Sequence, residues 1–154
     1  MENKNEVMAM SNDLAGINLL EQFKNPDNMF YCSIAMDGKR ETKKAVYNAI
    51  QNATDRCENH INKTIDIVNV IAHPVELADD ETGEIITAVR TVLIAKDGKS
   101  YEAVSGGIAN AISRIMSIMG SPEGGEWEKE PVKAMIVQKP TRNGNNKILS
   151  LELV

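Results

Sequence analysis

Five runs rich in β-branched residues follow one another from Thr64 to the last residue. They predict strands over 64–77, 85–95, 101–104, 132–138 and 147–153, separated by turn signals such as Asp97-Gly98. Pro74 lies inside the first run, and because proline cannot donate a backbone hydrogen bond, it predicts a bulge or an edge segment late in that strand. The pattern therefore predicts a long first strand that bends.

A single helix interrupts the strands. The stretch SGGIANAISRIM predicts a helix up to Met119, which Gly120 ends, with Ser105 as its cap and the glycines allowing close approach to a strand. The expected buried stripe is Ile108, Ala111, Ile112, Ile115, Ile118 and Met119. One helix between the third and fourth of five strands is the element order of the oligonucleotide-binding (OB) barrel, although other small α+β folds can share this order. We therefore expect a mainly β (α+β) fold, an OB-fold five-stranded barrel with an N-terminal strand and helix added.

The added part precedes Thr64. We expect a single domain over 1–154, in which 1–63 form an N-terminal extension and 64–154 the OB-like core. Within the extension, 13–23 predict a short helix, 29–36 a strand and 41–54 a helix.

Composition narrows the function classes. The net charge of -5 gives no strongly basic signal for nucleic acid, although a local patch, not the total, is what binds phosphate. The sequence has two cysteines, no apolar run of membrane-spanning length and no signal-peptide pattern. We expect a cytoplasmic protein with free thiols.

No motif in the sequence predicts catalysis or a bound cofactor. The two glycines of SGGIANAISRIM fit neither the P-loop nor the dinucleotide fingerprint, and no G-x-S-x-G occurs. Cys57 and His60 have metal-ligand spacing, but no second pair completes a tetrahedral site. We expect a protein that is not an enzyme and has no cofactor and no metal.

One local charge bias points to nucleic acid. No acid occurs from Pro131 to Leu151, and this stretch carries four cations: Lys133, Lys139, Arg142 and Lys147. Arg90, Lys99 and Tyr101 lie on the middle hairpin. The OB barrel binds ligands on its second and third strands and on the loop between its fourth and fifth, which are the elements that hold these residues. A solvated hairpin end is the alternative explanation.

Three stretches resemble the single-stranded DNA-binding proteins of tailed phages, including small phages that replicate linear DNA from a protein primer. They are DGKSYEAVS (a D-G-x-x-Y-x-x-x-S pattern), the apolar helix after it, and VKAMIVQKPTRNGNNKILSLEL. The resemblance implies an OB barrel that coats single-stranded DNA with little sequence preference, in phage DNA replication or recombination inside a bacterial host cell. It implies no catalysis and no cofactor. Phage replication proteins are further candidate partners, and a homodimer or cooperative assembly on DNA stays open.

The resemblance also implies roles for individual residues. Tyr101 matches the motif tyrosine and would stack on a base, with a core-facing ring as its competing role. The cations that would contact phosphates are Arg90, Lys99, Lys133, Lys139, Arg142 and Lys147. Further stacking candidates are Tyr31, Phe30, Tyr47 and Trp127.

A non-enzymatic protein-interaction module is the second hypothesis. Its acidic clusters, 79–84 and 123–130, fit an inhibitor that mimics nucleic acid. A mimic would show no salt-sensitive DNA binding, whereas a DNA-coating protein would lose affinity when its cations are reversed.

Overall fold

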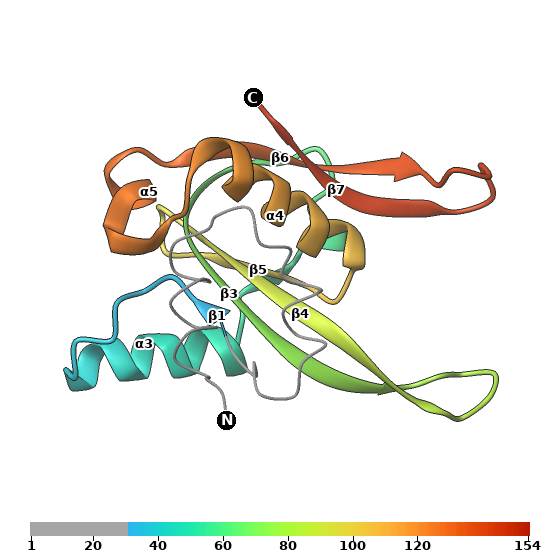
Figure 1. Cartoon of the computed structure of the whole chain (residues 1–154), viewed down its shortest axis with the longest axis horizontal. Coiled ribbons are helices and arrows are strands. Elements are labelled where there is room, and N and C mark those ends of the chain that lie inside the picture. The colour runs from blue at the N-terminus through green and yellow to red at the C-terminus, as the bar shows by residue number, and fades with distance from the viewer. Residues whose placement is uncertain (1–30) are drawn as a thin grey trace, which may run out of the picture.

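The computed structural model describes residues 31–154, and their strands form one strongly curled sheet (Figure 1). In this part of the chain the sheet has seven strands, ordered β2-β5-β4-β3-β6-β7, with β1 paired to β3. The helix expected over 13–23, and the residues Met29 and Phe30, lie outside the described residues.

Five strands of the sheet are the ones expected after residue 63. They are β3 (Thr64–Ala78), β4 (Ile85–Ala95), β5 (Ser100–Ala103), β6 (Val132–Pro140) and β7 (Lys147–Leu153). The long β3 pairs with β4 over most of its length and with β6 at its start, so that one strand joins both halves of the curl. The expected mainly β, OB-like architecture is confirmed.

The bend in β3 does not lie where proline predicted it. The register against β4 shifts between Ile67 and Asn69, and Pro74 pairs regularly with Val89, so the expected bulge at Pro74 is wrong. Val70 directs its backbone groups away from β4, toward residue 33 beside β1. Pro74 is four residues further along the strand and has the same orientation. The N–H group that proline lacks would therefore face away from β4. On that side, Pro74 has no strand partner among the described residues. The alternative expectation, an edge segment, therefore holds.

Between residue 31 and β3, the structure has three short elements and one helix. They are β1 (Tyr31–Cys32), α3 (Arg40–Gln51), β2 (Asp55–Arg56) and the 3-10 turn η1 (Cys57–Asn59). The helix ends at Gln51 rather than at Thr54, and β2 and η1 were not expected. Val46 of α3 packs on Ile71 and Val92, which point outward from β3 and β4, so α3 covers the outer face of the sheet.

The inner face of the curl holds the main core, and α4 (Gly106–Met119) packs over it. The Ser105 hydroxyl accepts a hydrogen bond from the Gly107 N–H at 3.0 Å, which confirms the expected helix cap. A Cβ on Gly107 would lie 1.9 Å from the carbonyl oxygen of Leu149 on β7. The expected close approach of helix and strand is therefore confirmed at Gly107.

The buried side of α4 differs from the predicted stripe at its C-terminal end. Ile118 is 81% exposed and Met119 53% exposed, while Ala109 and Met116 are buried instead. The buried arc is centred near Ile112 and Met116, which puts Ile118 at its edge and leaves Met119 in the last turn. None of the helices in residues 31–154 is long and apolar enough to cross a membrane.

Two hairpins project from the sheet toward the same end of the molecule's long axis (Figure 1). The β3–β4 hairpin carries the acids of its turn, Asp79, Asp80, Glu81 and Glu84. The β6–β7 hairpin carries Lys139, Arg142 and Lys147 and is called the basic arm below. The fold therefore places one acidic and one basic projection on the same side.

Candidate nucleic-acid interface

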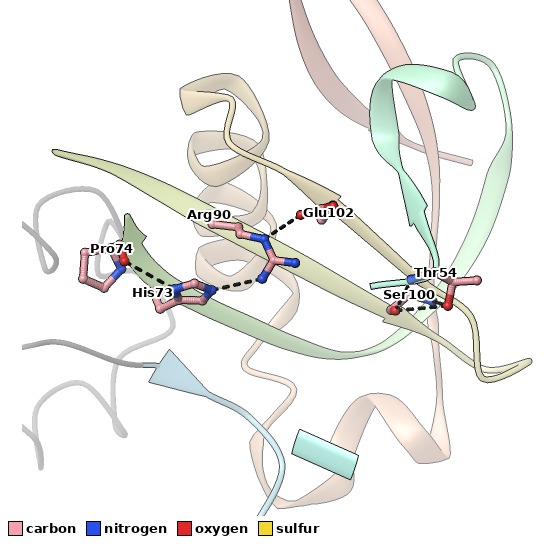
Figure 2. Close-up of polar contacts among 6 residues, drawn as sticks. All are labelled: Thr54, His73, Pro74, Arg90, Ser100 and Glu102. Carbon is pink, nitrogen blue, oxygen red and sulfur yellow. Dashed lines mark hydrogen bonds and ion pairs between the residues drawn. The ribbon is translucent and has the colours of Figure 1, made fainter. Parts of the chain in front are cut away.

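Three polar side chains cross the outer face of the sheet (Figure 2). Arg90 on β4 donates from Nε to Glu102 of β5 at 2.5 Å and from a terminal nitrogen to Nε2 of His73 on β3 at 3.0 Å. The Arg90 side chain is only 12% exposed. The cation expected to contact a phosphate is thus neutralised by a carboxylate in a charge-assisted hydrogen bond, which a phosphate would have to displace.

The hydrogen bonds fix the protonation state of His73. Because Arg90 donates to Nε2, that nitrogen accepts, and Nδ1 carries the proton that faces the carbonyl oxygen of Pro74 at 3.3 Å. Burial lowers the pKa of His73 from its usual value, and the positive charge of Arg90 lowers it further. Folding therefore favours the neutral form of this imidazole.

The lowered pKa predicts a pH-dependent stability. The unfolded chain takes up a proton at His73 as the pH falls below about 6.5, whereas the folded protein resists it, so the free energy of unfolding should fall in that window and level off below the folded pKa. The slope from one group is at most about 1.4 kcal/mol per pH unit. Urea unfolding at about pH 7.5 and about pH 5.5 measures it. His73→Gln keeps an acceptor for Arg90 and should reduce the difference; an equal loss in both proteins would contradict the assignment.

Tyr101 does not present its ring to solvent. It is 1% exposed and packs in the main core, where its cross-strand neighbour is Leu93. Its neighbours on β5, Ser100 and Glu102, take the outer face, because successive side chains of a strand alternate between faces. The ring also meets His60 edge to face at 5.4 Å. The expectation that Tyr101 stacks on a base is corrected here: the ring is on the core side of β5.

Tyr31 is half-buried. Its hydroxyl lies 4.0 Å from the sulfur of Met116, to which it donates, and its ring packs against the main core. Burial raises the pKa of this hydroxyl well above its usual range, and the charge of Glu123 adds to the effect. The ring thus supports α4, which leaves little of it for stacking on a base.

The basic arm keeps two cations without acidic partners. Lys139 lies 3.6 Å from Glu152, but Arg142 and Lys147 form no ion pair with any described residue and are exposed. The turn holds its own shape, because the side-chain oxygen of Asn143 accepts from the Thr141 hydroxyl at 2.7 Å and from the Asn145 N–H at 3.1 Å. A stiff turn therefore presents Arg142 and Lys147 to solvent.

Lys133 and Lys99 lie at the opposite end of the sheet from the tip of this arm. Lys133 pairs across strands with Asp66 and bonds to its carboxylate at 3.1 Å. The β4–β5 turn with Lys99 follows Ala95, whose partner Ile67 pairs with Val132 at the start of β6. From there to Pro140 at the arm, β6 runs about 26 Å at ~3.3 Å per residue. The six predicted cations therefore do not form one strip.

The acidic segment around Trp127 is structured, not an open loop. It forms η2 (Glu123–Gly125) and α5 (Glu126–Lys129), and Trp127 is 3% exposed in the main core. Glu128 accepts a hydrogen bond from the amide of Asn69 at 2.8 Å. Trp127 is thus corrected from a stacking candidate to a core residue. Among residues 31–154, no group of three His, Cys, Asp or Glu side chains is arranged to hold a metal ion.

Comparison with known proteins gives one family match. Residues 24–154 match the Phi29 family model described as phage single-stranded DNA-binding protein. No curated protein and no solved structure matches the chain. The match covers the whole described part of the chain, so it includes α3 as well as the five strands that follow.

Proposed function

Because the chain belongs to the phage single-stranded DNA-binding protein family, we propose that it coats single-stranded DNA with little sequence preference during phage DNA replication or recombination. The observation that carries the proposal, beside the family itself, is the basic arm. It forms the loop between the fourth and fifth barrel strands, which OB folds use for oligonucleotides, and it presents Arg142 and Lys147 without acidic partners.

The chemistry of this arm fits contacts that do not depend on sequence. Guanidinium and ammonium groups bind phosphate oxygens, which every nucleotide carries, and these contacts release counterions from the strand. In this proposal the chain binds single-stranded DNA without a catalytic step, in the cytoplasm of the host cell. Phage replication proteins and further copies of the chain are its candidate partners.

The acidic β3–β4 turn supports the second hypothesis, a module that binds a protein in place of nucleic acid. Its acids project toward the same end of the molecule as the basic arm (Figure 1), but Asp79 accepts from the N–H groups of Glu81 and Thr82 at 2.8 and 3.0 Å and so serves the turn itself. The other acidic cluster is built around a buried tryptophan. The single-strand proposal therefore has the stronger support.

Charge reversal on the basic arm tests the proposal. Arg142→Glu with Lys147→Glu is expected to weaken binding to a labelled oligo-dT about tenfold at low salt, because two phosphate contacts of up to ~1 kcal/mol each are lost and repulsion is added. The slope of log K against log salt should become shallower by about 1.4. Fluorescence anisotropy at several salt concentrations measures both quantities.

Arg56→Glu with Lys129→Glu is the matched control. It changes the charge equally, but Arg56 and Lys129 are exposed cations that already lie 3.8 and 3.7 Å from Glu58 and Glu126. The affinity of the control for oligo-dT should be much closer to that of wild type. If both double variants bind oligo-dT equally, the basic arm is not the contact. If wild type itself binds no DNA at low salt, the acidic module becomes the better account.

A further inference from the structure

A basic helix face that contains none of the six predicted cations lies on the N-terminal part of the fold. Arg40, Lys43, Lys44 and Tyr47 are spaced i, i+3, i+4 and i+7 along α3, which puts all four on one side of the helix. They line a single open hollow together with Gly38 and Asn48. We call these four residues the α3 basic face.

None of these side chains is engaged elsewhere in the described structure. The three cations are exposed, Tyr47 is 62% exposed, and no ion pair or side-chain hydrogen bond joins any of the four to another of residues 31–154. The side of α3 that packs on the sheet is the one around Val46, about 100° around the helix from Tyr47. As far as residues 31–154 are concerned, the basic face is therefore free to bind a ligand.

The ring on this face is the distinctive feature. Binding of single strands without sequence preference combines cations with aromatic rings on which bases stack. Tyr101 and Trp127 are buried and Tyr31 is half-buried, so Tyr47 is the exposed tyrosine or tryptophan in the described part of the chain.

The position of α3 explains why the ring is there. An OB barrel binds oligonucleotides on the outer face of its second and third strands. In this chain α3 packs on Val92 and Ile94 of β4, and Arg90 and Glu102 neutralise each other beside them. A DNA strand that approaches that face would therefore contact α3 before it contacts the sheet.

We propose that the α3 basic face is a second contact for single-stranded DNA, in which Arg40, Lys43 and Lys44 bind phosphates and Tyr47 stacks on a base. Arg40 to Tyr47 spans about 10 Å of helix axis, the length of about three stacked nucleotides at ~3.4 Å each. This contact rests on the proposed function and extends it. In Figure 1, α3 lies at the end of the molecule opposite the basic arm, so only a longer strand can reach both.

Strand length separates the two contacts in an experiment. Oligo-dT of about 10 nucleotides is long enough for one of the two contacts, and oligo-dT of about 40 nucleotides is long enough for both. Lys43→Glu with Lys44→Glu is expected to lower affinity for the long strand at least fivefold and to make its salt slope shallower by about 1.4. Tyr47→Ala should lower that affinity about tenfold with the salt slope unchanged. Glutamate and alanine form helices well, so α3 should stay folded, and circular dichroism checks this.

The Arg56→Glu, Lys129→Glu variant again serves as control. If the α3 variants bind the long strand as tightly as the control does, the second contact is overturned. The proposed function still stands in that case, because wild type binds the strand. Equal losses on the 10-nucleotide and long strands would also overturn it, because the face would then belong to the arm's own contact. Failure of wild type to bind either length would overturn the proposed function instead.

Discussion

Replacing Tyr101 with alanine is expected to lower the free energy of unfolding by about 3–5 kcal/mol, the usual cost of removing a large buried ring. The ring is 1% exposed, faces Leu93 across the strands and meets His60 edge to face. Alanine would remove most of its contacts and leave a cavity beside Leu93 and His60, which the packed strands could close only in part. Urea unfolding followed by circular dichroism measures the loss.

Tyr101→Phe is the control for this prediction. It keeps the ring and its volume, so the free energy of unfolding should change by less than about 1.5 kcal/mol. The opposite result for the alanine variant would contradict the core assignment: unchanged stability together with a marked loss of affinity for oligo-dT. That pattern would return Tyr101 to the role of a stacking ring.

Gly107→Ala is expected to destabilise the protein by about 1–3 kcal/mol or more, the cost of overpacking a tight contact. The new Cβ would lie 1.9 Å from the carbonyl oxygen of Leu149 and 2.7 Å from the side chain of Ile148. Alanine is favoured over glycine in a helix by only about 1 kcal/mol. The clash is with backbone, which cannot rotate away as a side chain can, so the steric cost exceeds the helix gain and α4 must shift away from β7.

Ser117→Ala on the exposed side of the same helix is the matched control, and it should change stability by less than about 0.5 kcal/mol. Thermal unfolding of both variants beside wild type gives the comparison. A Gly107→Ala protein that melts at or above the wild-type temperature would show that α4 and β7 are not in the tight contact described.

The strands after residue 63 were predictable because their signals are local. The β4 prediction of 85–95 matches the structure at both ends, and β7 matches over 147–153. In each, β-branched residues run between turn signals, so the pattern and the boundary agree. Ser105 and Gly107 were predictable for the same reason, since helix caps and glycine contacts depend on a few neighbouring residues.

Position within the sheet was harder to predict, because it depends on pairing between distant residues. The bend of β3 lies beside Val68 rather than at Pro74, since the register against β4 sets it. The orientation of Tyr101 depends on which of two alternating positions on β5 faces inward. A short strand such as β5 has too few residues for alternation to settle this. The two-residue β2 gave no signal at all, because it forms only where β5 is available to pair with it.

The candidate site was predictable only in part. The absence of acids over 131–151 located the basic arm, but it did not reveal the acids that pairing brings from outside that stretch. Asp66 reaches Lys133 and Glu152 reaches Lys139, so Arg142 and Lys147 are the arm's unpaired cations within the described structure. The α3 basic face had a readable signal in its i, i+3, i+4, i+7 spacing. That signal gained meaning only when the structure showed that Tyr47 is exposed, whereas Tyr101 and Trp127 are buried and Tyr31 is half-buried.

The central claim is that this chain binds single-stranded DNA through phosphate contacts, and competition between DNA forms tests it most directly. Wild-type protein bound to labelled oligo-dT of about 40 nucleotides is challenged with unlabelled oligo-dT or with a duplex of equal length, at low and moderate salt. The account predicts that the single strand displaces the label at far lower concentration than the duplex, and that affinity falls as salt rises. Equal displacement by duplex, or an affinity that does not change with salt, would contradict it.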